Sequence, residues 1–243
     1  MLRKPLIALA CTVLLAACAH VPERNPMATW VPSDNHDARR PTVIVLHYTE
    51  QDSVEQSLRT LRTRNSGGRV SSHYLIGADG RIYQLVADSE RAWHAGAGRW
   101  GQITDLNSAS IGIELDNNGR TPFAQPQIDS LIRLLDDLTA RLRIPRTQII
   151  GHSDLAPGRK IDPGPLFPWR QLAEAGFGIW PAADTPPPPP GFDPMQALRV
   201  IGYPTDNPQA AIRSYRMRFR GDDRPELDAE DLRILHALTV LRD

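Results

Sequence analysis

The sequence predicts an α/β domain, in which helices flank a mixed β-sheet, followed by a small all-helical domain. Short apolar, β-branched runs alternate with helical patterns up to about residue 180, whereas residues 192–243 show only helical patterns. Between these regions, Thr185 precedes five consecutive prolines and Gly191, which is typical of a stiff polyproline spacer. We therefore place the first domain at residues 41–180 and a linker at residues 181–191.

Length and composition exclude several classes of protein. The 243 residues can form one substantial domain and a small one. The formal net charge is +0, which favours neither a nucleic acid nor an acidic membrane surface as a partner. The only two cysteines, Cys11 and Cys18, both lie near the N-terminus, which excludes a disulfide framework.

The N-terminus has the pattern of a secretory signal. Arg3 and Lys4 precede an apolar run from Leu6 to Ala17, which is too short to span a membrane. The run ends in Leu-Ala-Ala-Cys18, which resembles the lipobox of bacterial lipoproteins, whose cysteine becomes lipidated after cleavage. We therefore expect a signal peptide at residues 1–17 and lipidation of Cys18; the alternative is an ordinary signal peptide cleaved nearby.

The residues after Cys18 bear on the cellular location of the protein. Residues 18–40 are polar and rich in Pro, Asn and Asp, which suits a tether leading into the fold. Ala19 follows Cys18, where an Asp would indicate retention in the inner membrane. By resemblance, we expect an outer-membrane lipoprotein that faces the periplasm and contacts the membrane only through its lipid.

The elements of the fold follow from periodicity and turn signals. The β-branched run from Thr42 to His47 predicts a buried strand. A helix follows, with Asp52 or Ser53 as its N-cap, and stops near residues 65–68. Residues 87–107 form a long irregular stretch, and loops of this length are usually functional. The other expected elements are a hairpin of residues 71–76 and 81–86, a strand over 109–115, a helix over 126–142, a short strand over 147–150, a helical turn over 169–175, and helices over 194–201, 208–220 and 228–241.

Two histidines stand where apolar strands end. His47 ends the first strand, and His152 ends the run from Gln148 to Gly151. Either histidine alone could be a core residue bonded to the backbone. Two such histidines with a nearby carboxylate fit a zinc site that has three protein ligands and an open fourth position.

Asp154 and Asp162 are the candidates for the third ligand. Asp154 opens a turn toward Pro157 and Gly158, so its alternative role is turn capping. Lys160 and Asp162 are two residues apart in an extended segment, which directs both side chains the same way. We favour Asp162 as the ligand and Lys160 as a neighbouring cation.

Glu114 is the other unusual side chain. It lies in the apolar run from Ile111 to Leu115, where an ionised carboxylate is costly to bury. Beside a metal-bound water, a buried glutamate is a good general base, because burial raises its pKa toward neutrality. The alternative is a glutamate on a solvent-exposed face of the sheet.

Several of these segments together resemble the zinc N-acetylmuramoyl-L-alanine amidases of the AmpD and AmiD type, whose fold is shared with peptidoglycan-recognition proteins. The resemblance covers nearly all of residues 40–180. The lipobox and the C-terminal helices are most similar to the outer-membrane lipoprotein members, the AmiD type. The matching segments are residues 46–49, 72–76, 91–96, 112–114 and 151–164.

The resemblance implies roles for individual residues. His47, His152 and Asp162 match the zinc ligands, Glu114 the residue that activates water, and Lys160 the residue that stabilises the oxyanion. His73 and His94 match pocket-lining positions, where they either contact substrate or only order the loop, and Trp93 is a further candidate for substrate binding. Residues 192–243 resemble, more loosely, a peptidoglycan-binding module, and we expect them to be dispensable for the chemistry.

The implied activity is zinc-dependent hydrolysis of the amide bond between the lactyl group of N-acetylmuramic acid, or its anhydro form, and L-alanine. Peptidoglycan and muropeptides are then the partners, in cell-wall turnover or recycling. Two alternatives remain at this stage: a recognition protein of the same fold that binds fragments without cutting them, and a zinc peptidase that cuts within the stem peptide.

Overall fold

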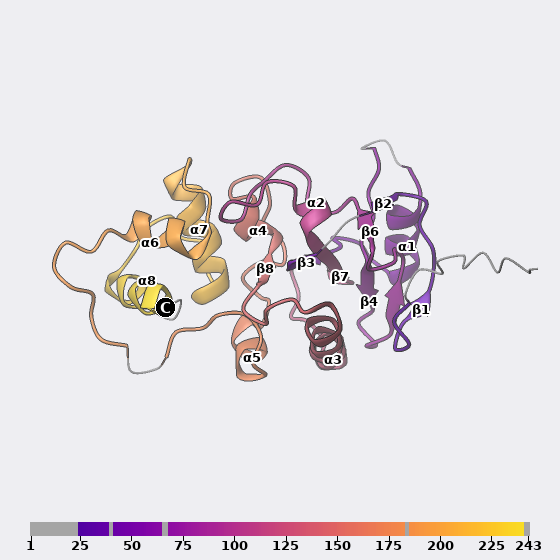
Figure 1. Ribbon diagram of the computed structural model, residues 1–243. Coiled ribbons are helices and arrows are strands. Elements are labelled where there is room, and N and C mark those ends of the chain that lie inside the picture. Colours follow the sequence, from indigo (N-terminus) through magenta and orange to yellow (C-terminus); the bar gives the residue numbers. More distant parts are fainter. Residues whose placement is uncertain (1–23, 39–40, 65–67, 183–184, 241–243) are drawn as a thin grey trace, which may run out of the picture.

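The structure is a computed structural model that describes residues 24–38, 41–64, 68–182 and 185–240 (Figure 1). The expected signal peptide and Cys18 lie outside these residues. Within the described ranges, no helix has the length and apolar character that a membrane crossing requires.

A six-stranded mixed sheet forms the centre of the first domain, with the order β1-β5-β4-β7-β3-β8. β3 lies between β7 and β8 and is parallel to both. β4 and β5 form the predicted antiparallel hairpin, so the expected mixed sheet is confirmed. The strands are β1 (Thr29–Trp30), β3 (Val43–Tyr48), β4 (Tyr74–Ile76), β5 (Ile82–Gln84), β7 (Ser110–Leu115) and β8 (Ile149–Gly151).

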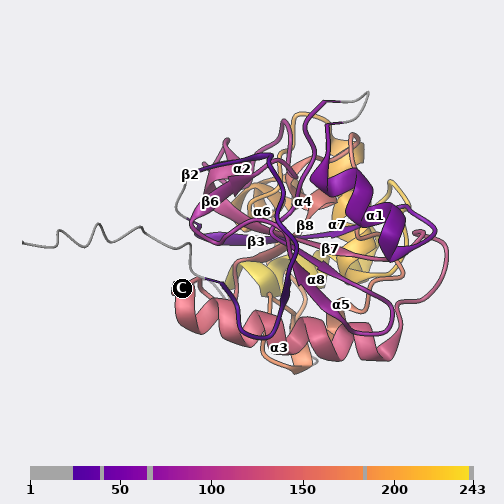
Figure 2. The ribbon, with the colours of Figure 1, turned by 90° about the vertical axis from the view of Figure 1, so that its right-hand side faces the viewer.

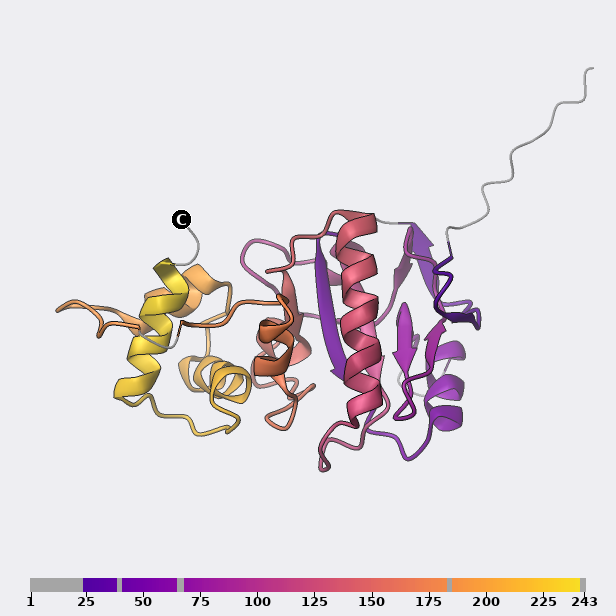
Figure 3. The ribbon, with the colours of Figure 1, turned by 90° about the horizontal axis from the view of Figure 1, so that it is seen from below.

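Helices cover both faces of this sheet (Figure 2). The amphipathic α3 (Gln125–Leu142) packs leucines on the face that contains Ile44 and Leu46, and Figure 3 shows it lying along the strands. α1 (Val54–Arg62) packs on the opposite face, where Leu61 joins Leu75. Ser53 caps α1 as expected, because its side chain accepts a hydrogen bond from the backbone N–H of Gln56.

Some short elements were not expected from the sequence. β2 (His36–Ala38) pairs with β6 (Glu90–Ala92), and β1 joins β5, so part of the expected tether belongs to the fold. α1 ends three residues before residue 65, with Thr63 as its C-cap. Strands of two or three residues are too short for their side chains to show alternation. Two short helices were also not expected, α2 (Leu106–Ala109) and α4 (His152–Leu155), whereas α5 (Trp169–Glu174) is the helical turn predicted over residues 169–175.

The three predicted C-terminal helices form as expected and pack directly against the sheet. α6 (Pro194–Ile201), α7 (Pro208–Phe219) and α8 (Ala229–Val240) contribute to one apolar cluster with strand residues such as Val45 and Ile150. Figure 1 shows α7 beside α4 and β8, while residues 185–193 loop around the far side of α6 and α8. The proline-rich segment therefore does not hold the helices away from the first domain.

Candidate active site

The ends of β3 and β7 bring two of the predicted residues together. In the parallel register His47 lies opposite Glu114. Ile44 and Leu46 face the core under α3, so alternation directs His47 and Glu114 to the opposite face of the sheet. Gly112 precedes Glu114 on this face, where a Cβ atom would come within 2.5 Å of the His94 ring. The glycine therefore allows a histidine to pack over the strand.

The three predicted metal ligands meet at this end of the sheet. Nδ1 of His47 and Nδ1 of His152 lie 2.9 and 3.0 Å from the same oxygen, Oδ2 of Asp162. Their candidate ligand atoms all lie within 4.8 Å of one another, and all three residues are buried. Two imidazole nitrogens and one carboxylate oxygen form a donor set typical of a catalytic zinc site.

Both imidazoles are also held from their other side. Nε2 of His47 lies 3.1 Å from Nδ1 of His94, and Nε2 of His152 lies 2.8 Å from the carbonyl oxygen of Ala95. With Nδ1 of each ring directed at a metal, Nε2 bears the proton and donates to these partners. Such outer contacts fix the tautomer and orientation of metal-binding histidines. The residues present therefore fit a zinc ion.

The protonation states of the ligands suit a cation as well. Burial and the nearby His152 together lower the pKa of His47 to about 4, although the hydrogen bond to Asp162 acts in the opposite direction. In the metal-free protein, burial alone would raise the pKa of Asp162, but hydrogen bonds from Nδ1 of His152 and His47 outweigh it and hold that pKa well below its usual range. At neutral pH this gives a neutral His47 imidazole and a charged carboxylate, which are the forms that bind metal.

Glu114 points into the same region with an unused oxygen. Its side chain is buried, and among the described residues Oε2 has no hydrogen-bond partner. Burial raises the pKa of Glu114 well above its usual value, and the charge of Asp162 acts in the same direction, whereas Lys160 opposes it. A carboxylate in this environment accepts a proton readily.

The predicted ligands, Glu114 and Lys160 surround one cavity of about 420 Å³. This volume lies within the range of roughly 300–1,000 Å³ that is usual for ligand sites. The cavity opens between the end of the sheet, α1 and the segment that follows α4. Its lining includes His47, Tyr48, His94, Glu114, His152, Arg159, Lys160 and Asp162.

Only one of the three expected substrate-contacting residues lines this cavity. His94 does, whereas His73 and Trp93 are not among its lining residues. His73 is fully buried, accepts a hydrogen bond from the Gly112 N–H at Nδ1, and donates through Nε2 to the Glu90 carbonyl. The guanidinium of Arg91 stacks over the Trp93 ring at 4.3 Å. A contact between substrate and His73 or Trp93 therefore stays a prediction, and the contacts of His73 agree with the alternative that it orders the loop.

Two residues that the sequence did not single out complete the site. Asn107 accepts hydrogen bonds at Oδ1 from the backbone N–H groups of His94 (3.0 Å) and Ala95 (2.9 Å). Arg159 lines the cavity and donates to the Ala95 carbonyl oxygen at 2.7 Å. The side chain of Asn107 thus fixes the segment that contacts both histidine ligands. The sequence around Asn107 gives no signal for this role, because the hydrogen bonds join two points of one irregular loop.

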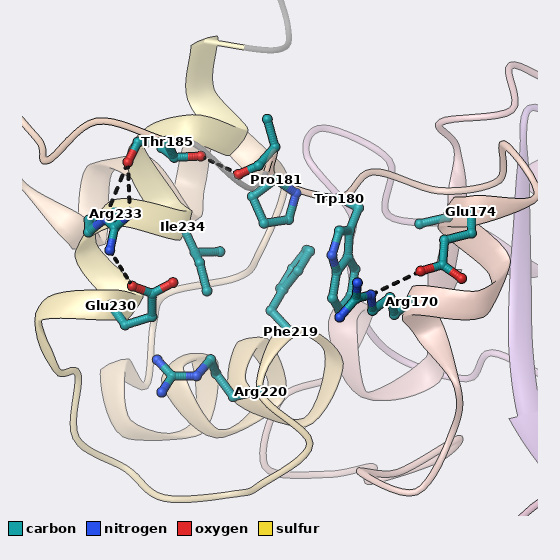
Figure 4. A pocket seen from close by; sticks show the side chains of 12 residues that line it. Arg170, Glu174, Trp180, Pro181, Thr185, Phe219, Arg220, Glu230, Arg233 and Ile234 are labelled. Carbon is teal, nitrogen blue, oxygen red and sulfur yellow. Dashed lines mark hydrogen bonds and ion pairs between the residues drawn. The ribbon is translucent and has the colours of Figure 1, made fainter.

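A larger cavity lies elsewhere, between α5 and the C-terminal helices (Figure 4). It measures about 510 Å³, and Trp180, Phe219 and Ile234 form its apolar part. Its arginines are already paired with carboxylates: Arg170 lies 3.0 Å from Glu174, Arg233 lies 2.9 Å from Glu230, and Arg220 contacts Asp228. Size alone therefore does not identify the candidate active site.

The raised pKa of Glu114 gives a testable pH dependence of stability. Above the usual value of 4.5, the folded metal-free protein keeps a proton on Glu114 that the unfolded chain has lost, so stability decreases as pH rises. Glu114→Gln removes the titrating carboxyl group and with it this pH dependence. We expect the melting temperature of the metal-free variant, relative to that of the metal-free wild type, to be higher at pH 8 than at pH 5.

Thermal melts of the two proteins at both pH values measure this difference. Glu174→Gln, at an exposed glutamate outside this cavity, is the control for loss of a carboxylate. A difference between wild type and Glu114→Gln that stays constant with pH would contradict the assigned burial of the charge.

The comparisons with known proteins agree with this geometry. The family described as N-acetylmuramoyl-L-alanine amidase matches residues 37–165. The chain is 46% identical over 157 residues to the N-acetylmuramoyl-L-alanine amidase AmiD of Escherichia coli K12, covering 58% of this chain and 55% of that protein. It is 32% identical over 164 residues to the 1,6-anhydro-N-acetylmuramyl-L-alanine amidase AmpD of Enterobacter cloacae, covering 60% of this chain and 88% of that protein. The match to AmiD thus spans about half the length of that relative.

Two solved structures are similar over most of the chain. AmiD from E. coli, in complex with the substrate anhydro-N-acetylmuramic acid-L-Ala-D-γ-Glu-L-Lys, has a TM-score of 0.75 at 38% identity. That match covers 84% of this chain and 91% of the other. AmpDh3 from Pseudomonas aeruginosa has a TM-score of 0.76 at 30% identity and covers 98% of this chain and 99% of its own. The predicted fold class is therefore confirmed.

Proposed function

Because this chain belongs to the N-acetylmuramoyl-L-alanine amidase family, we propose that it hydrolyses the amide bond between the lactyl group of N-acetylmuramic acid, or its anhydro form, and L-alanine. One observation supports this most strongly: His47, His152, Asp162 and Glu114 face one cavity. The solved E. coli AmiD was bound to an anhydro-muramoyl peptide of this class. Peptidoglycan and muropeptides are the proposed substrates, in cell-wall turnover or recycling.

The proposed cofactor is Zn²⁺, held by Nδ1 of His47, Nδ1 of His152 and a carboxylate oxygen of Asp162. When bound there, Zn²⁺ supplies Lewis-acid polarisation of the substrate carbonyl and a lower pKa for water. His94 and the Ala95 carbonyl keep the two imidazoles in their metal-binding tautomer. This cofactor is the one that the donor set suits best.

The chain's own side chains supply the proton transfers and part of the charge stabilisation. Glu114 removes a proton from the attacking water and then delivers it to the nitrogen of the leaving L-alanine, as a general base and acid. Lys160 lines the same cavity and stabilises the negative charge that develops on the carbonyl oxygen. The described residues contain no cysteine, and no covalent intermediate is required.

Fragment analysis separates this function from its alternatives. Incubated with purified muropeptides or cell walls, the enzyme is expected to release intact stem peptides that begin with L-alanine, because the lactyl amide is the bond cut. Mass spectrometry of the soluble products identifies them. Products cut within the stem would indicate a peptidase, and binding without any product would indicate a recognition protein.

The proposed location is the outer membrane, through a lipid on Cys18. A single acyl chain binds a membrane only marginally, whereas a bacterial lipoprotein cysteine acquires several chains. Cys18→Ser should therefore move the protein from the membrane fraction to the soluble fraction, or leave an uncleaved precursor. Cell fractionation and immunoblotting measure this, with Ala19→Ser as the control. A Cys18→Ser protein that is still processed and membrane-bound would rule out this anchor.

A further inference from the structure

The segment that contains His152 is tied to the fold on both sides. The backbone N–H of Gly151, just before His152, donates to Oδ2 of Asp154 at 2.8 Å. The backbone N–H of Ser153, just after it, donates to the carbonyl oxygen of Asp162 at 2.8 Å. The position of the imidazole at the metal site therefore depends on where the Asp154 carboxylate is held. Turn capping, the alternative noted for Asp154, describes only part of its contacts.

Two residues of the C-terminal helical region hold that carboxylate. The hydroxyl of Tyr203, just after α6, donates to Oδ1 of Asp154 at 2.8 Å. Nη1 of Arg218, on α7, lies 2.8 Å from Oδ2. Nη2 of Arg218 also donates to the carbonyl oxygen of Ile149 at 3.0 Å, which ties the same side chain to β8.

These contacts are enclosed. Asp154 is 0% exposed, Tyr203 2% and Arg218 3%. The Arg218 guanidinium stacks over the Trp169 ring at 4.3 Å, and Trp100 packs edge-on against Tyr203 with ring centroids 5.2 Å apart. In such a low-dielectric environment, a carboxylate that loses its cationic partner must shift or gain water to be satisfied. A shifted carboxylate would no longer hold the Gly151 N–H, which donates a hydrogen bond to it, in the same place.

We propose that Arg218 and Tyr203 are positioning residues for the metal site: through Asp154 they fix the Gly151–His152 backbone, so zinc affinity and turnover depend on the C-terminal helices. This inference rests on the proposed zinc amidase function. It gives residues 192–243 a second role, in contrast to the sequence-based expectation that they are dispensable for the chemistry.

The same helix provides a matched control. Arg216 is also buried on α7, but its guanidinium pairs with Asp222 and Asp231, which both belong to the C-terminal region. Arg216→Met and Arg218→Met each remove one buried guanidinium from α7, and only the second loses a contact with Asp154. Comparing them separates positioning of the metal site from general loss of packing.

The experiment measures zinc affinity and steady-state kinetics of full-length proteins. Competition with a chromophoric chelator gives the zinc dissociation constant. We expect Arg218→Met to weaken zinc binding and kcat by about 10-fold or more, the range seen when outer-shell partners of metal ligands are lost. KM should stay within about 2-fold, since substrate contacts remain. Arg218→Lys, which keeps the charge, should recover part of both losses.

Tyr203→Phe provides a test if Arg218→Met does not fold, because it removes only the hydroxyl. It should weaken zinc binding in the same direction, by a smaller factor. Near-UV circular dichroism verifies that each compared variant is folded. Equal zinc affinity and kcat in Arg218→Met and Arg216→Met, or a Tyr203→Phe protein identical to wild type, would overturn the inference. A wild-type protein that neither binds zinc nor cuts muropeptides would instead overturn the proposed function.

Discussion

His152→Ala is expected to abolish hydrolysis and to remove most of the bound zinc. The variant leaves only His47 and Asp162 of the three ligands that meet at the end of the sheet. Losing an outer partner of a ligand costs about 10–100-fold in metal affinity. Loss of the ligand itself should cost more, so we expect zinc binding to weaken by more than about 100-fold. Elemental analysis after dialysis and a muropeptide assay measure the two effects.

His36→Ala is the matched control for this variant. His36 is a half-exposed histidine that pairs with Glu90 on the short β2–β6 sheet, away from the ligand set. It should keep both zinc content and activity. Full zinc content and activity in His152→Ala would show that the metal site has been assigned incorrectly.

Glu114→Ala is expected to separate metal binding from chemistry. Glu114 faces the ligand set without belonging to it, so the variant should retain zinc. Its turnover should decrease by roughly 10²-fold or more, as for loss of a general base. Zinc content and kcat, measured on the same preparation, test both halves of this expectation.

The isosteric variant Glu114→Gln strengthens the test, because it keeps the size of the side chain and removes only its ability to accept a proton. It should be as inactive as Glu114→Ala. An active variant of either kind would remove Glu114 from the mechanism, and loss of zinc in both would make it part of the metal site.

The regular elements were largely predictable from local signals. The strands that became β3 and β7 are continuous apolar runs, and the leucines of α3 have clear helical spacing. β1, β2 and β6 were missed because two or three residues cannot show a period, and their pairing is decided by distant partners. Packing of the C-terminal helices on the sheet was also not predictable, since a proline-rich segment suggests separation.

Some residues of the candidate site could likewise be predicted from local signals, and others could not. The ligands and Glu114 stand at strand ends or in an apolar run, where a charged or imidazole group is unusual, and a family resemblance supported their roles. The position of His73 was not predictable, because its hydrogen bonds to Gly112 and Glu90 depend on how the strands meet. The partners of Asp154 lie 49 and 64 residues away along the chain, beyond any local pattern.

The apolar cluster shared by the sheet and the C-terminal helices has a consequence for how the enzyme meets an insoluble polymer. Val43, Val45 and Ile150 are buried together with Leu198 and Tyr215, so the two regions share one apolar core, and we expect them to move together. A flexibly tethered module could search for attachment points at many distances from the cut. Here the shared core fixes the helices relative to the cavity, so the peptidoglycan binding expected of residues 192–243 would require polymer segments of matching geometry.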